Sequence, residues 1–215
     1  MKRILFLTMF VMGVSYSAWA SSCASGALSA YEVPLFSCNI GDLVFSNFAS
    51  SGIDTTTTVS DIPGPEAGLQ FGVDLTALGP GSETPSIDYV VTCNGCTLDD
   101  WALQTGGAGS LGNGGVSVIE FSTPGLLTQF TEGPGNVTSG TGSATFAPTG
   151  APLSITTSIA LGGGTSGTVT TLGSVTNLFS QTSTPPPPGV PEPSLLILSA
   201  GLLSLLPFAR RKFLR

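Results

Sequence analysis

The sequence predicts an all-β protein: an antiparallel β-sandwich or jelly roll over residues 21–181, followed by a Pro-rich linker and one hydrophobic helix. Short apolar or alternating runs recur along residues 21–181, separated by Gly, Pro, Asn or Asp, which is typical of short strands joined by turns. Residues 23–180 show no helical periodicity and contain no Lys or Arg, two strong helix formers. The length of this segment fits one domain.

The first 20 residues have the pattern of a secretory signal peptide. Lys2-Arg3 forms a basic start, residues 4–14 form an apolar core, and residues 18–20 (Ala-Trp-Ala) match a cleavage site. We therefore expect residues 1–20 to be removed. A retained membrane helix is one alternative, but a bilayer requires about 20 apolar residues and this run is shorter. A lipoprotein attached through Cys23 is another, although Ala20 stands where a lipoprotein signal has Leu.

Individual strands follow from the alternation of side chains. The clearest strand covers residues 153–161, and residues 87–93 alternate in the same way. The first of these carries Leu153, Ile155, Thr157, Ile159 and Leu161 on one face and Ser154, Thr156, Ser158 and Ala160 on the other. Further strands are expected in LVFSNF, TTTTVS, LQFGVDL, DDWALQ, VSVIEF, LLTQFT, GTVTTLG and SVTNLF. About ten short strands with turns between them favour a sandwich.

Two segments are predicted to be loops, and the large aromatic residues are predicted to lie in the core. The segments GGAGSLGNGG and GPGNVTSGTGSATFAPTGAP are rich in Gly, Ser and Thr, so we expect flexible or long hairpin loops there. Large aromatic side chains are expected to supply most of the buried volume. These are Phe45, Phe48, Phe71, Tyr89, Trp101, Phe121, Phe130 and Phe146.

The four cysteines are expected to form two disulfides, because an even number of cysteines in an exported chain favours pairing. Local pairing, Cys23 with Cys38 and Cys93 with Cys96, is preferred among the three connectivities. The Cys93–Cys96 spacing also occurs in redox motifs and in half of a zinc site. A zinc site requires a second such pair or histidines, and the chain has neither. A turn closed by a small disulfide ring is therefore favoured.

Charge is distributed very unevenly along the chain. Between Ser21 and Ala209 there is no Lys, Arg or His, whereas all thirteen Asp and Glu residues lie in that span. A purely acidic surface repels phosphate backbones, which argues against nucleic-acid partners. Divalent cations are its natural small partners. The basic residues are confined to the two ends: Lys2, Arg3, Arg210, Arg211, Lys212 and Arg215.

Catalysis is not expected from this composition. The lack of His, Lys and Arg in the exported part removes the usual general base and the usual anion clamps. A glycoside hydrolase needs only two carboxylates, and Asp99 with Asp100 is the candidate pair. Adjacent residues in a strand point to opposite faces, however, so these two are poorly placed to act together.

Calcium is the one ligand that the composition favours, and no other cofactor is expected. Calcium takes oxygen ligands from carboxylates and carbonyls, which irregular loops between strands supply. The candidate ligands are Asn94, Asp99 and Asp100, with the Asp54 and Asp61 loop as a second location.

The C-terminal region combines a linker, an apolar run and a basic end. Residues 182–189 contain four consecutive prolines, which favour an extended polyproline II spacer. Residues 194–209 carry no charge and would reach about 24 Å as a helix, so they span a bilayer core of about 30 Å only with local thinning and snorkelling. The tail carries Arg210, Arg211, Lys212 and Arg215, which would hold the C-terminus in the cytoplasm and the acidic domain outside.

Residues 190–215 resemble the PEP-CTERM sorting signal of Gram-negative bacteria. The resemblance rests on Val190-Pro191-Glu192-Pro193-Ser194, on an apolar helix containing Gly201, and on the basic end at residues 210–212. It implies recognition by an exosortase-type membrane protease, cleavage near residues 191–193, and transfer to the cell surface or an exopolysaccharide matrix. Pro207 is a mild departure that leaves the recognition element untouched.

Together these observations predict a noncatalytic exported protein. The C-terminal helix would anchor it transiently in the inner membrane with the domain outside, and processing would deliver it to the envelope, cell surface or biofilm matrix. One alternative is a calcium- or carbohydrate-binding extracellular module. A second alternative is a carboxylate-based glycoside hydrolase.

Overall fold

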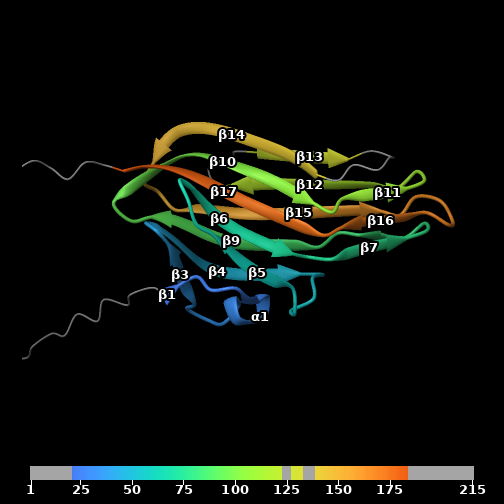
Figure 1. The fold of residues 1–215 in the computed structure, drawn as a ribbon, viewed down its shortest axis with the longest axis horizontal. Coiled ribbons are helices and arrows are strands. Elements are labelled where there is room, and N and C mark those ends of the chain that lie inside the picture. The colour runs from blue at the N-terminus through green and yellow to red at the C-terminus, as the bar shows by residue number, and fades with distance from the viewer. Residues whose placement is uncertain (1–20, 123–126, 133–138, 184–215) are drawn as a thin grey trace, which may run out of the picture. The chain divides into compact units, whose positions relative to one another are not determined.

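The computed structural model describes residues 21–122, 127–132 and 139–183 (Figure 1). Most of these residues lie in β-strands, and their one helix, α1 (Leu28–Tyr31), is a single turn. Within the described ranges every strand pair is antiparallel except β1 with β3. The predicted all-β architecture with antiparallel sheets is therefore confirmed. No helix in these ranges is long and apolar enough to cross a membrane.

The strands form two large sheets and one small sheet. The first sheet contains, in spatial order, β1 (Ser21–Ser22), β3 (Ser37–Ile40), β4 (Leu43–Ser51), β9 (Ser86–Cys93), β15 (Leu153–Gly162), β12 (Gly115–Ser122) and β13 (Leu127–Glu132), and β8 (Ser82–Glu83) also pairs with β15. The second contains β14 (Ser139–Thr149), β10 (Cys96–Gly106), β17 (Ser174–Ser183), β6 (Glu66–Gly72), β5 (Thr58–Ile62) and β2 (Gly26–Ala27). The third contains β11 (Gly109–Leu111), β16 (Val169–Leu172) and β7 (Leu75–Leu78).

The third sheet continues the second beyond a local break in its ladder. Strands β10, β17 and β6 each join a strand of the third sheet through only one or two residues (Figure 1). At the break Gly173 N–H donates to the Gly106 carbonyl at 3.0 Å, and Asp74 N–H donates to the Gly173 carbonyl at 3.2 Å. Asp74 and Gly107 have φ angles of 44° and 66°, which redirects the chain between the two sheets.

The first two sheets face each other across one apolar core. Trp101 of β10 and Tyr89 of β9 are among its largest buried side chains. Phe45 of β4 and Phe179 of β17 meet across the core with ring centroids 6.0 Å apart. Strand β15 buries the five residues predicted for its inner face, including Thr157. The period-two alternation of the sequence therefore gave the correct inward face for this strand.

Two predictions about the core and loops are wrong. Phe121 is 49% exposed because β12 turns Val116, Val118 and Glu120 inward, which leaves Phe121 on the outer face. The second loop segment contains β14, which pairs with β10 over eight residue positions. Small residues permit this backbone pairing without supplying an alternating apolar signal. Phe146 packs against the core, while the side chain of Phe130 lies outside the described set.

Candidate functional site

The predicted calcium ligands follow one another around the β9–β10 turn. Asn94 lies in the turn, and its backbone N–H donates to the Asp42 carbonyl at 2.9 Å. Asp99 and Asp100 lie in β10 at a bulge. Leu98 pairs with Gln181 and Asp100 pairs with Ser180, so β10 has one extra residue, Asp99, relative to β17. The prediction that Asp99 and Asp100 point to opposite faces of a regular strand is therefore wrong, because the bulge interrupts the alternation. The two aspartates fall between the inward Leu98 and the inward Trp101, and both are half-buried.

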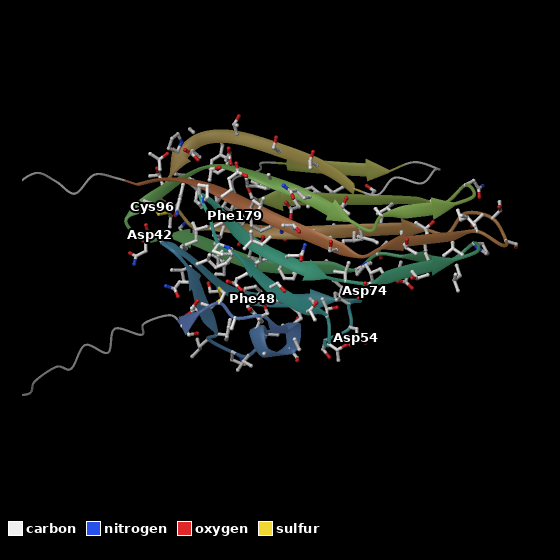
Figure 2. All side chains as sticks on the ribbon, viewed as in Figure 1. Asp42, Phe48, Asp54, Asp74, Cys96 and Phe179 are labelled. Carbon is white, nitrogen blue, oxygen red and sulfur yellow. A yellow bond between two sulfur atoms is a disulfide. The ribbon has the colours of Figure 1, made fainter. Side chains whose placement is uncertain are left out.

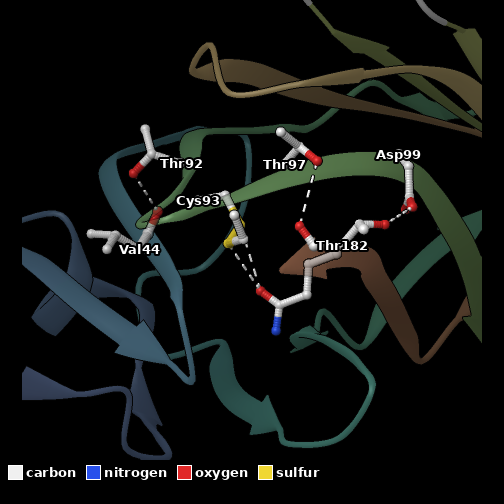
Figure 3. The surroundings of a disulfide bond; sticks show 8 residues. Val44, Thr92, Cys93, Thr97, Asp99 and Thr182 are labelled. Carbon is white, nitrogen blue, oxygen red and sulfur yellow. Dashed lines mark hydrogen bonds between the residues drawn. A yellow bond between two sulfur atoms is a disulfide. The ribbon is translucent and has the colours of Figure 1, made fainter. Parts of the chain in front are cut away.

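The bulge directs Asp99 towards the last strand. Its Oδ2 accepts a hydrogen bond of 2.6 Å from Thr182 Oγ1, as Figure 3 shows. Its other carboxylate oxygen is buried and has no hydrogen-bond partner. Among the residues that the structure describes, no three His, Cys, Asp or Glu side chains come together in a way that could hold a metal ion. A calcium site around Asn94, Asp99 and Asp100 stays a prediction.

Both disulfides have the preferred local pairing. One joins Cys23 to Cys38, and the other joins Cys93 to Cys96 across the β9–β10 turn. The amide oxygen of Gln181 lies 3.5 Å from Cys93 Sγ and 3.4 Å from Cys96 Sγ (Figure 3). The Cys93–Cys96 pair therefore closes the turn through which the chain passes from the first sheet to the second. A helix, which would open a thioredoxin-like motif, does not follow it.

A buried carboxyl group that sequence reasoning missed lies between the sheets. Glu120 is fully buried, and its Oε2 accepts a hydrogen bond of 2.7 Å from Trp101 Nε1. Its Oε1 accepts a second bond of 2.7 Å from Thr157 Oγ1. Burial raises the pKa of Glu120 from 4.5 to about 7, although these two hydrogen bonds oppose the rise. Glu120 lies on the same face of β12 as Val116 and Val118, and this alternation could have predicted its burial from the sequence.

The polar network extends from Glu120 to the second sheet. Asn177 Nδ2 donates to the Tyr89 hydroxyl at 2.7 Å and to Thr157 Oγ1 at 3.3 Å. Burial, with Glu120 as the second cause, raises the pKa of Tyr89 well above its usual value. Every member of the network is at most 2% exposed, so a substrate has no access to the carboxyl. The network aligns the two sheets instead.

An open cavity lies beside the start of β5 and the end of β6. Its volume is about 210 Å³, and it is lined by Asp54, Thr56, Thr57, Thr58, Gly72, Val73 and Asp74. Asp54 Oδ1 accepts hydrogen bonds from the backbone N–H and the hydroxyl of Thr56, both at 2.8 Å. These bonds lower the pKa of Asp54, so it is ionised at neutral pH. Asp61, which the sequence grouped with Asp54, lies within β5 and does not line the cavity.

The hairpin register explains why the two aspartates share this cavity. Thr58 of β5 pairs with Gly72 of β6, so the residues just before β5 and just after β6 leave the hairpin at the same end. Figure 2 labels Asp54 and Asp74 near that end. Recognising residues 63–65 as the turn of a β5–β6 hairpin would have been enough to place Asp74 near Asp54 from the sequence.

The residues predicted to direct sorting lie outside the described ranges. These are the motif Val190, Pro191, Glu192, Pro193 and Ser194 and the basic residues Arg210, Arg211, Lys212 and Arg215. The predicted signal peptide at residues 1–20 and most of the linker at residues 182–189 also lie outside them.

Comparisons with known proteins give only distant likenesses. No family model matches this chain, and no curated protein matches it. The carbohydrate-binding module TmCBM61, solved with beta-1,4-galactotriose, is similar with a TM-score of 0.32 and 11% identity, over 65% of this chain and 90% of that one. A family 11 carbohydrate-binding module from Clostridium thermocellum, solved with a mixed-linked tetrasaccharide, gives a TM-score of 0.21 and 13% identity, over 76% of this chain and 100% of that one. The enzymatically active domain of bacteriophage CBA120 tailspike protein 4 gives a TM-score of 0.24 and 14% identity, over 67% of this chain and 20% of that one. Likenesses at this level assign neither a ligand nor an activity.

Proposed function

We propose that this chain is an exported, noncatalytic protein whose C-terminus sorts it to the cell surface or to an exopolysaccharide matrix. One observation carries the proposal: a signal-peptide pattern at residues 1–20 occurs together with a PEP-CTERM-like element at residues 190–215. The two disulfides support it, because such bonds persist in oxidising compartments outside the cytoplasm.

The proposal gives each part of the C-terminus a separate task. The proline run at residues 185–188 spaces the folded domain from the bilayer, so that a membrane protease reaches residues 190–194. The apolar run at residues 194–209 holds the chain in the membrane until it is cut, and the basic tail fixes its orientation. An exosortase-type protease is the partner that this arrangement requires.

Replacement of Pro191, Glu192 and Pro193 by alanine tests the sorting proposal. We expect the variant to keep its C-terminal tail and to accumulate at the inner membrane, and mass spectrometry of the native protein measures the tail directly. Three alanines at residues 185–187 form a control with the same number of altered positions. They keep the number of spacer residues and leave residues 190–194 intact, so this control should still be processed, although more slowly if the stiffness of the proline run also matters for access. Unchanged mature mass and surface delivery in the first variant would refute the proposal.

The outer face of the first sheet favours a second candidate function, carbohydrate binding. Phe121, Thr156 and Asp88 lie in one register row across β12, β15 and β9. Phe121 is the only aromatic residue among the exposed large apolar side chains that the structure describes, which do not include Phe130. Asp88 Oδ1 accepts a hydrogen bond of 2.5 Å from Thr156 Oγ1. An exposed ring beside a hydroxyl and a carboxylate offers a stacking surface together with partners for sugar hydroxyls.

A glycan panel with Phe121→Ala tests this second candidate. We expect wild-type binding to at least one polysaccharide and its loss in the variant, because the ring supplies most of the contact area. Leu111→Ala is the control: Leu111 is also an exposed apolar residue, at 65%, but it belongs to the third sheet. No binding by the wild type, or equal losses in both variants, would contradict the candidate.

A further inference from the structure

Three polar side chains from three strands meet inside the core, where water does not reach them. Glu120 of β12, Thr157 of β15 and Asn177 of β17 are each fully buried. Strands β12 and β15 belong to the first sheet and β17 to the second, so the cluster bridges the two layers. Burying an acid, a hydroxyl and an amide is unfavourable, and Asn177 Oδ1 has no hydrogen-bond partner. Apolar side chains would join the two sheets at a lower cost.

The hydroxyl of Thr157 is placed as a nucleophile beside a base. Its Oγ1 donates to Glu120 Oε1 at 2.7 Å, which is within the range for proton transfer. Burial raises the pKa of Glu120 to about 7, so near neutral pH this carboxyl both takes up and releases a proton. Tyr89 of β9 is the other titratable side chain of the network, and burial raises its pKa well above the usual value, which keeps it protonated. A hydroxyl paired with an adjacent base is the arrangement that activates a weak oxygen nucleophile.

The side-chain amide of Asn177 supplies a carbonyl carbon within reach of this hydroxyl. Its Nδ2 lies 3.3 Å from Thr157 Oγ1, and the carbonyl carbon is bonded directly to that nitrogen. The amide also lowers the pKa of Glu120 through a hydrogen bond, so it lies beside the same carboxyl. The terminal torsion of an Asn side chain has broad energy wells, so a modest rotation turns the carbon towards the hydroxyl. Reacting groups that are held together in this way react far faster than free ones.

We propose that Thr157 and Asn177 form an intramolecular ester bond between β15 and β17, with Glu120 transferring the proton. Thr157 Oγ1 attacks the carbonyl carbon of the Asn177 side chain while Glu120 takes the hydroxyl proton. The bond between that carbon and Nδ2 then breaks, Glu120 passes the proton to the departing nitrogen, and one ammonia leaves. One O–H and one C–N bond are exchanged for one C–O and one N–H bond, so no oxidant, reductant or other co-reactant is required.

The buried position accounts for a reaction that occurs once and is then preserved. Each chain reacts only with itself, so no external substrate has to reach the carboxyl and the protein does not turn over. Exclusion of water protects the ester from hydrolysis, and the released ammonia is diluted in the solvent, which opposes the reverse reaction. The ester oxygen of Thr157 still accepts a hydrogen bond from Glu120 when that carboxyl is protonated. The proposal depends neither on sorting nor on carbohydrate binding at Phe121.

Mass spectrometry of the purified wild-type protein, unfolded after incubation at about pH 7, tests the proposal. We compare it with Thr157→Val, which keeps the shape of the side chain and removes the nucleophile. After allowance for the substitution, the wild type should be lighter by one ammonia. Chymotrypsin cuts after residues such as Leu161 and Leu172, and it should leave the wild-type peptides that contain residues 157 and 177 joined. Both proteins have the same C-terminal processing, so the comparison is independent of the sorting proposal.

Three further variants show whether the reaction needs the named groups. Glu120→Gln should keep the ammonia, whereas Thr157→Ser retains a hydroxyl and should still lose it. The matched control is Thr170→Val, because Thr170 is equally buried but its hydroxyl bonds to Ser110 and the Gly162 carbonyl instead of a carboxylate. This control should lose ammonia as the wild type does.

The design also separates the ester from another source of ammonia. Cyclisation of Asn94 or Asn113 onto the glycine that follows each of them releases ammonia too, but it does not require Thr157. Three results would overturn the proposal: a wild type that keeps its full mass, the same ammonia loss in Thr157→Val, or separate peptides for residues 157 and 177. The first and third are read from the wild type alone, so they hold even where a variant fails to fold.

Discussion

The buried carboxyl of Glu120 predicts how the stability of this protein depends on pH. In the folded protein its pKa is raised from 4.5 to about 7, so the folded state binds this proton more tightly than the unfolded state. The stabilising contribution is therefore fully present below about pH 4.5 and is lost as the pH rises through about 7. A difference of about 2.5 pKa units corresponds to about 3 kcal/mol, at 1.36 kcal/mol per unit.

The hydrogen bonds around Glu120 explain how the protein accommodates the neutral form. Trp101 Nε1–H can only donate, so Oε2 accepts its bond in both protonation states. The hydroxyl of Thr157 can either donate or accept, so a proton on Oε1 can be donated across the same 2.7 Å. Protonation thus removes a buried charge and keeps this hydrogen bond with its direction reversed.

Glu120→Gln isolates this effect because it removes the titration and keeps nearly the same shape. Urea denaturation of both proteins between about pH 5 and pH 8 gives two curves of unfolding free energy, and the other carboxyl groups contribute equally to both. We expect the wild type to lose about 3 kcal/mol relative to the variant over this interval. A constant difference between the curves at all pH values would refute the assigned pKa rise, whatever the absolute stabilities.

Other predictions concern the disulfides and one close backbone contact. Replacing Cys23 and Cys38 by serine should lower the unfolding free energy by about 3 kcal/mol, and replacing Cys93 and Cys96 should lower it by about 2 kcal/mol. The first loss is larger because the Cys23–Cys38 bond closes the longer loop and so restricts the unfolded chain more. Urea denaturation checks both, and the reverse order would contradict the loop-entropy account. Gly68→Ala should cost more than about 4 kcal/mol, because its Cβ would lie 1.8 Å from a backbone carbonyl oxygen of β17. A soluble variant with wild-type thermal stability would show that the β6–β17 spacing is wrong.

The sequence predicted best where alternation alone decides the outcome. In residues 153–161 every inward residue is apolar or Thr, so only one face fits the core. The run VSVIEF is different, because one of its faces carries Val, Val and Glu and the other carries Ser, Ile and Phe. Hydrophobicity favours burying Phe121, but the hydrogen bonds from Trp101 and Thr157 satisfy Glu120 inside. Those donors come from distant strands, so a single segment gives no sign of them.

Features that depend on pairing between strands were not predictable locally. Strand β14 forms because β10 provides a partner for its backbone, and its side chains are too small to alternate visibly. The bulge at Asp99 shifts two aspartates without any Gly or Pro to mark it. The cavity was half predicted: Asp54 was named from its loop, but Asp74 joins it only through the register of the β5–β6 hairpin.

The place of β17 in the second sheet has a mechanical consequence. It is the last strand of the described chain, and it lies between β10 and β6 rather than at an edge. Force applied through the residues that follow Ser183 therefore enters a strand that is hydrogen-bonded on both sides. Ladder bonds run perpendicular to the strands, so a pull along β17 loads many of them at once instead of opening them one by one. A domain held by its C-terminal end would resist tension through a strand that is paired along both of its edges.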